Sequence, residues 1–155
     1  MLMLLLSAGG DTYAVDVARV IEVVPLVEIQ RLPLAPEYVA GLLNYHGVMA
    51  PVIDLGCLIR EAACAPRLST RIVLIDYPGA AAGSTHVLGL MAERVVETID
   101  VKRERMIPTN VRVKETPYLG EMISDDRGMI PRLEVDRLLP DSLRRSLFAG
   151  HCENT

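Results

Sequence analysis

The sequence contains no tryptophan and a single phenylalanine, although half of its 155 residues are hydrophobic. Aromatic side chains can therefore fill little of the interior, and aliphatic side chains must form most of the core. A length of 155 residues is typical of a single domain, and this amount of apolar side chain supports a substantial core.

Cysteine is scarce as well, and basic residues are not in excess. The three cysteines, Cys57, Cys64 and Cys152, are odd in number and do not have the spacing of metal ligands. We interpret them as free thiols of a reducing compartment. The formal net charge of −4 argues against a nucleic-acid-binding protein, which needs a basic surface.

The first residues, Met1 to Ser7, are apolar but have no basic residue ahead of them. A secretion signal needs such a basic start, and the stretch is too short to span a bilayer. The turn residues Gly9 and Gly10 follow almost at once. We therefore expect a first β-strand and a cytoplasmic protein.

Recognisable catalytic motifs are missing. There is no G-x-S-x-G nucleophile motif, and the loop from Pro78 to Ser84 lacks the lysine of a phosphate-binding loop. His46, His86 and His151 have no metal-ligand spacing. We therefore expect no catalysis, no cofactor and no metal ion. The alternative is a small β-barrel ligand-binding sensor or hydrolase that uses His46 or His86.

The sequence does contain many short apolar runs separated by turn residues, which is typical of strands. The stretch from Gly41 to Leu55 (GLLNYHGVMAPVIDL) predicts a β-hairpin, because apolar arms flank a turn at Tyr45–Gly47. Asp54 is placed to cap a helical turn that follows it. The segment from Pro36 to Gly41 predicts another short helical turn ahead of the hairpin.

This pattern occurs twice. The segment Leu88 to Thr98 aligns without a gap with Tyr13 to Val23, and Arg94–Glu97 then coincides with Arg19–Glu22. The segment Tyr118 to Pro131 resembles the central hairpin. The sequence therefore indicates an internal repeat of roughly 65 residues.

Repeats of this size are near the lower limit for an independent core, so the two should pack against each other. Short strands with tight turns fit small closed or nearly closed barrels, which leave few free edges. We predict a mainly β single domain of residues 1–155, with a first half at about 1–66 and a second half at about 67–139. Leu139, Leu143 and Leu147 share one helical face, which predicts a C-terminal helix over residues 140–150, with Leu138 as the alternative start, and residues 151–155 form a loose tail.

The central hairpin also carries a resemblance to a known family. The stretch Asn44 to Leu55 (NYHGVMAPVIDL) is similar to the signature N-(apolar)-R-G-x-(I/V)-x-P-(I/V)-(I/V)-D-L of the CheW-like coupling-protein domain of bacterial chemotaxis. The resemblance extends from the first strand to about Leu139. It implies two pseudo-symmetric, small five-stranded SH3-like β-barrels that share a hydrophobic core, with short helical turns.

The resemblance further implies a stand-alone, non-enzymatic adaptor that couples chemoreceptors (methyl-accepting proteins) to a CheA-type histidine kinase. In this family the receptor's helical hairpin tip binds a groove between the barrels, and the kinase regulatory domain binds barrel ends. The partner-binding residues that follow by position are Val17, Val20, Glu22, Asn44, His46 and Gly47. Apolar anchors beside a polar residue suit an amphipathic helix, although Val17 and Val20 as interior residues are the alternative.

One position departs from the family signature, because His46 stands where the family usually has arginine. Arginine carries a permanent planar charge, whereas histidine is shorter and largely neutral at neutral pH. A salt bridge made by the family arginine is therefore lost or becomes pH-sensitive. We expect a coupling protein of a specialised chemosensory pathway with matched partners.

Overall fold

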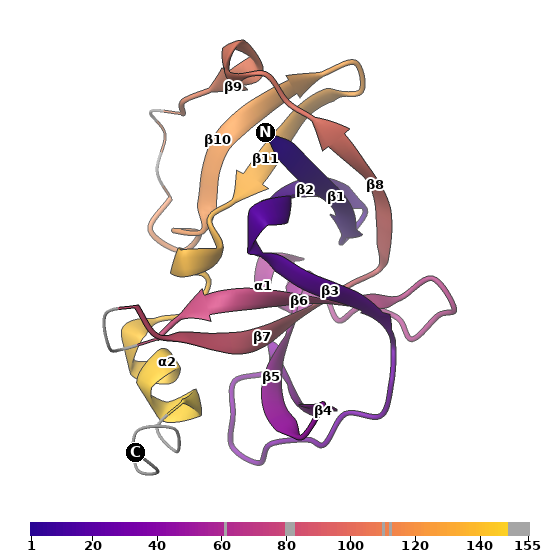
Figure 1. Ribbon diagram of the computed structural model, residues 1–155, viewed down its shortest axis with the longest axis vertical. Coiled ribbons are helices and arrows are strands. Elements are labelled where there is room, and N and C mark those ends of the chain that lie inside the picture. The colour runs from indigo at the N-terminus through magenta and orange to yellow at the C-terminus, as the bar shows by residue number, and fades with distance from the viewer. Residues whose placement is uncertain (61, 80–82, 110, 112, 149–155) are drawn as a thin grey trace.

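The computed structural model describes residues 1–60, 62–79, 83–109, 111 and 113–148, and it confirms the predicted mainly β architecture (Figure 1). The strands are β1 (Leu2–Ala8), β2 (Asp11–Asp16), β3 (Val20–Pro25), β4 (Val39–Tyr45), β5 (Val48–Asp54), β6 (Arg71–Pro78), β7 (Thr85–Ala92), β8 (Arg94–Asp100), β9 (Met106–Ile107), β10 (Leu119–Asp125) and β11 (Gly128–Leu133). The helical elements are the 3-10 turns η1 (Val17–Arg19), η2 (Arg103–Arg105) and η3 (Val135–Arg137) and the α-helices α1 (Leu55–Arg60) and α2 (Asp141–Leu147). None of the helices in this described part of the chain is long and apolar enough to cross a membrane.

The strands form two sheets with the same internal order. The upper sheet of Figure 1 has the order β8-β1-β2-β11-β10-β9, and the lower sheet has the order β3-β6-β7-β5-β4. Each sheet contains one parallel pair, β2 with β11 and β7 with β5, and its other neighbours are antiparallel. The two sheets are therefore pseudo-symmetric, as the sequence predicted, with the two-residue β9 as an additional strand.

The two sequence repeats exchange their first hairpins. Strands β1 to β5 belong to the first repeat, and β6, β7, β8, β10 and β11 belong to the second. The hairpin β1–β2 nevertheless pairs with β8 and β11, and the hairpin β6–β7 pairs with β3 and β5. Each sheet therefore takes its central hairpin from the other repeat, and neither repeat forms a sheet from its own strands.

Alternating residues of β1 and β6 enter different cores. A shared core between the two sheets contains Leu4, Leu6, Val73 and Ile75, each at most 7% exposed. The intervening residues point into the interior of their own sheet and form an upper core, with Met3 and Leu5, and a lower core, with Ile72 and Leu74. Because complete burial of one such side chain contributes about 1.5–3 kcal/mol, these two strands stabilise both sheets and the junction between them.

Each sheet is nearly closed into a barrel by the chain that leaves one edge strand and reaches the other. In the upper sheet, the chain leaves β8, passes through η2 and pairs with β10 as β9. In the lower sheet, the chain leaves β3 and returns to β4, where the backbone of Gln30 bonds that of Leu42 at N–O distances of 2.9 and 2.7 Å. The nearly closed barrels that the sequence predicted are formed in this way.

The helical turn predicted for Pro36 to Gly41 is wrong. Residues 34 to 38 contain turns, and Gly41 lies inside β4 with a φ of 147° at a register shift. A Cβ atom at Gly41 would lie 2.2 Å from the Gln30 carbonyl oxygen. Glycine is required here because the returning chain approaches the β4 backbone closely, which a local pattern cannot reveal.

The predicted cap at Asp54 is present. This carboxylate is 7% exposed, and its oxygens accept hydrogen bonds from the backbone N–H groups of Cys57, in α1, and Cys64. It therefore fixes both the start of α1 and the connector that follows the helix. Neither Cys57 nor Cys64 is in a disulfide, in agreement with the prediction of thiols, whereas Cys152 lies outside the described residues.

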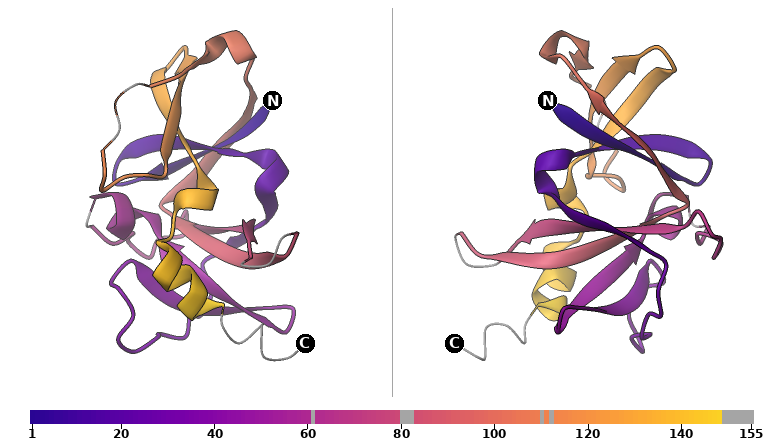
Figure 2. Two further views of the ribbon diagram at one scale, coloured as in Figure 1. Left: turned by 90° about the vertical axis from the view of Figure 1, so that its left-hand side faces the viewer. Right: turned by 45° about the vertical axis from the view of Figure 1, so that its right-hand side comes forward.

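The C-terminal helix α2 packs against the lower sheet, as Figure 2 shows from two further sides. The ring of Phe148, at its end, stacks on His86 at a centroid distance of 4.3 Å and lies 6.0 Å from Tyr77. The Tyr77 hydroxyl accepts a hydrogen bond from the Leu139 N–H at 3.3 Å. Residues 149–150 of the predicted helix and the predicted tail, 151–155, lie outside the described residues.

The Asp54 side chain should stabilise the fold more than the side chain of Glu134, which occupies the equivalent position in the second repeat. Both residues donate a backbone N–H to a tyrosine carbonyl, at 2.7 and 2.6 Å. The Glu134 side chain, however, is 31% exposed and forms an ion pair with Arg137 at 3.3 Å. Asp54→Ala leaves two N–H groups without their acceptor and should lower the free energy of unfolding by about 2–3 kcal/mol. Glu134→Ala should lower it by less than about 1 kcal/mol. Equal losses in urea unfolding would contradict this role of Asp54.

Cys64 should be a poorly reactive thiol. Burial, and then the nearby Asp54 carboxylate, raise the pKa of Cys64 to about 12. At pH 8 about one Cys64 thiol in ten thousand is then ionised, so alkylation should be roughly a thousandfold slower than in the unfolded chain. Peptide mass spectrometry after iodoacetamide treatment, with and without urea, measures this ratio. Rapid modification of Cys64 in the folded protein would disprove the assignment.

Candidate protein-interaction surface

Val17 and Val20 lie where the chain crosses from the upper sheet to the lower one. The Asp16 side chain starts η1 by accepting the Ala18 N–H at 3.0 Å, and η1 leads directly into β3. Both valines are half-buried and pack against the shared core. They therefore occupy the margin of that core, between a fully interior and a fully exposed position.

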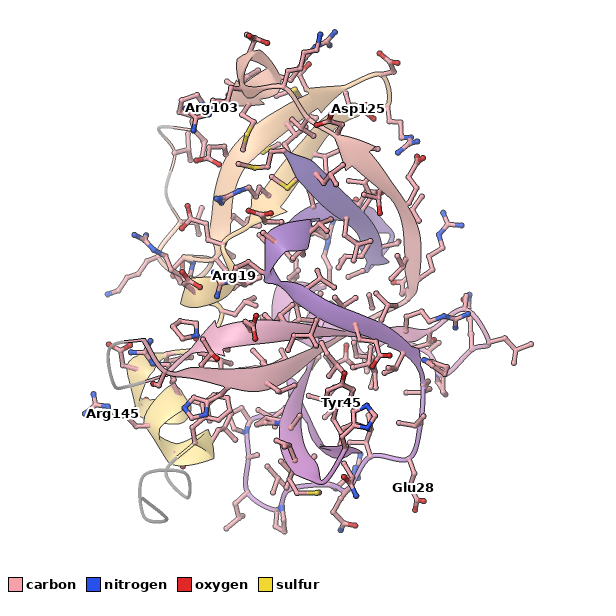
Figure 3. The ribbon with its side chains drawn as sticks, viewed as in Figure 1. Arg19, Glu28, Tyr45, Arg103, Asp125 and Arg145 are labelled. Atoms are coloured by element: carbon pink, nitrogen blue, oxygen red, sulfur yellow. The ribbon has the colours of Figure 1, made fainter. Side chains whose placement is uncertain are left out.

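Arg19 holds this crossover in place. Its guanidinium donates to the Asp76 carbonyl oxygen of β6 at 2.7 Å and forms an ion pair with Asp136 of η3 at 2.6 Å. Figure 3 shows Arg19 beside the junction of the two sheets. The sequence marks Arg19 only as a position of the repeat, because its contacts with Asp76 and Asp136 join segments that are distant along the chain.

A β-bulge sets the two faces of β3. Val20 lies opposite Ile75 and Val23 opposite Val73, although the two valines are three residues apart, because the register shifts between Val20 and Glu22. Val20 and Val23 therefore face the side of the shared core, and Val23 is 37% exposed. Together with Val17 they form a row that we call the crease valines.

Glu22 lies on the opposite face of β3. It is opposite Leu74, whose side chain belongs to the lower core. Its carboxylate interacts with the Tyr45 hydroxyl, at the end of β4, and this side-chain hydrogen bond is the main cause of a raised pKa of Tyr45. The contact spans the two edge strands of the lower sheet, and Figure 3 shows Tyr45 between β3 and the β4–β5 hairpin.

The β4–β5 turn explains part of the family signature. His46 and Gly47 have φ angles of 50° and 86°, as a two-residue type I′ turn requires. The Asn44 side-chain oxygen accepts the Gly47 N–H at 2.9 Å. Asn44 and Gly47 therefore stabilise the turn, while the exposed His46 ring lies edge-on to Tyr45 at 4.4 Å.

The structure thus divides the six predicted site residues into two groups. Val17 and Val20 lie beside the shared core, whereas Glu22 joins Asn44, His46 and Gly47 near the hairpin turn. Tyr45, which links Glu22 to that turn, was missed. The alternation of side chains along a strand places Tyr45 on the same face of β4 as the buried Leu43, two residues earlier. Its contact with β3, however, arises only because the closing barrel brings the two edge strands together.

The two histidines of the alternative function lie in unrelated surroundings. His46 is exposed in a turn, and His86 stacks on Phe148. A hollow of about 610 Å³ is lined by Thr109, Val111 and residues of 113–117 on one side and by strands β10 and β11 on the other, and neither histidine is among its lining residues. Within the described residues, no group of three or more His, Cys, Asp or Glu side chains is arranged to hold a metal ion.

The chain resembles known proteins over most of its length. Its sequence matches the CheW-like domain over residues 2–143. It is 21% identical to the chemotaxis protein CheW of Klebsiella aerogenes over 88% of this chain and 80% of that one. It is 25% identical to the chemotaxis protein CheW of Helicobacter pylori over 84% and 76%, respectively.

The fold matches a solved structure of the same family. The scaffolding protein TtCheW of Thermoanaerobacter tengcongensis superposes with a TM-score of 0.77 at 25% identity, covering 88% of this chain and 90% of that one. The two pseudo-symmetric sheets, the shared core and the hairpin signature agree with this match. The chain therefore belongs to the CheW-like domain family, whose members are non-enzymatic scaffold and coupling proteins of chemotaxis.

Proposed function

We propose that this protein is a cytoplasmic adaptor that couples the hairpin tip of a chemoreceptor to a CheA-type histidine kinase. Family membership supports a coupling role, and the crease valines supply a surface for it. Val17 and Val20 are half-buried and Val23 is exposed, and Val20 and Val23 lie along the edge strand β3, where a partner can approach. This row, set by the β3 bulge, is the observation on which the receptor assignment depends.

The crease valines suit one face of an amphipathic helix. Val20 and Val23 lie opposite residues two positions apart on β6, which corresponds to about 6.6 Å along a strand. One turn of an α-helix rises about 5.4 Å, so apolar residues three or four positions apart on the helix can meet both valines. A receptor hairpin presents such a helix.

The hairpin turn supports the second contact, with the kinase regulatory domain. Asn44 and Gly47 act there through the shape of the turn. The side chains that the turn offers to a partner are those of His46, Val48 and Met49, the last two 39% and 47% exposed. The replacement of the family arginine by His46 changes the charge of this surface, which supports a pathway with matched partners.

Val20→Asp should abolish receptor binding, because it places a carboxylate against the apolar face of the bound helix. Val95 is the matched control, since it is also half-buried and packs against the shared core from β8. Val95→Asp should lower the melting temperature comparably but keep receptor binding. Val23→Asp, at a more exposed position, should reduce binding with a smaller loss of stability. Titration calorimetry with the cognate receptor hairpin, beside thermal unfolding, measures both effects.

Two outcomes would contradict the proposal. If Val20→Asp and Val95→Asp weaken binding equally, the loss comes from destabilisation and the crease valines are not the receptor site. If the wild-type protein binds neither the receptor hairpin nor the kinase regulatory domain, the adaptor function is wrong.

A further inference from the structure

Equivalent glutamates of the two repeats have different partners. Glu97 in β8 occupies the position of Glu22 in β3 and forms an ion pair with Arg127, in the turn between β10 and β11. Glu22 interacts instead with the uncharged Tyr45 hydroxyl. Among the described residues, no lysine, arginine or histidine forms an ion pair with Glu22, so the lower barrel presents a carboxylate without a cation.

This difference matters once a partner covers the surface. Glu22 is exposed in the free protein, where water solvates its charge. A partner lying on β3 removes that water, and burial of a carboxylate is costly unless a cation pairs with it. Tyr45 supplies one hydrogen bond but no charge. A partner that covers Glu22 must therefore supply a positive charge of its own.

The position of Glu22 indicates where that charge lies. β3 is an edge strand, so a helix along it can contact both of its faces: the crease valines on one side and Glu22 on the other. The long side chain of lysine or arginine can extend across the strand edge. The ring of Tyr45, whose hydroxyl bonds Glu22, lies at the same place and can contact the cation through its face.

We infer that Glu22 binds a lysine or arginine of the receptor helix, about one helical turn from the apolar residue that contacts Val20. This inference rests on the proposed receptor function and specifies its partner, a helix that combines an apolar stripe with one basic residue beside it. The corresponding site of the upper barrel, already neutralised by Arg127, does not bind such a residue. The two barrels therefore have similar folds but differ in charge at this position, so that only the lower barrel offers an acidic site to the receptor helix.

The test uses the 155-residue chain and the cognate receptor hairpin in titration calorimetry. Glu22→Gln keeps an acceptor for the Tyr45 hydroxyl, so the fold should persist, but the affinity for the hairpin should fall roughly tenfold to a hundredfold. Glu97→Gln, the matched control, removes the equivalent charge from the other barrel and should leave the affinity unchanged. His46→Arg should also weaken binding, because it places a guanidinium next to Tyr45, the partner of Glu22, where it can pair with this carboxylate.

Charge reversal identifies the partner residue. Glu22→Lys should lose binding, and replacement of one basic residue of the hairpin by glutamate should restore it. The inference is overturned if Glu22→Gln binds as tightly as the wild type, if Glu97→Gln loses as much affinity, or if no basic residue of the hairpin gives this rescue. Loss of binding to the kinase domain alone would also overturn it. If the wild-type protein does not bind the hairpin at all, the proposed function fails together with the inference.

Discussion

The shared core between the two sheets is the contact on which the rest of the structure depends. β1 and β6 each bury both faces, so one set of their side chains fills a barrel and the other set joins the two barrels. Because the hairpins that carry these strands are exchanged between repeats, the junction is covalently continuous with both sheets. Separation of the two sheets would expose the shared core. It would also separate each exchanged hairpin from the other strands of its own repeat.

The interaction surfaces follow from this arrangement. The chain must cross between the sheets at η1, and Arg19 fixes that crossover to β6 and η3. The crossing leaves valines at the margin of the shared core, and the β3 bulge continues their row along an edge strand. The barrel closure then brings Glu22 to the hairpin turn. A rigid body with apolar and acidic positions at fixed spacing suits a protein that holds partners in place.

Local chemistry predicted much of this fold. Gly9–Gly10, Gly47 and Asp54 identified two turns and a helix cap, because each acts on its nearest neighbours along the chain. The repeat predicted two similar barrels, but similarity between halves does not reveal whose strands pair with whose. Gly41 was misread as a helix end, because its role depends on the distant Gln30. The contact of Glu22 with Tyr45 was missed for the same reason.

Separate expression of residues 1–66 and 67–155 tests the exchanged, shared-core architecture most directly. Because each sheet needs a hairpin from the other repeat, neither fragment should fold as a monomer, and an equimolar mixture should recover the dispersed NMR spectrum and cooperative unfolding of the intact chain. A monomeric fragment that unfolds cooperatively on its own would contradict the account.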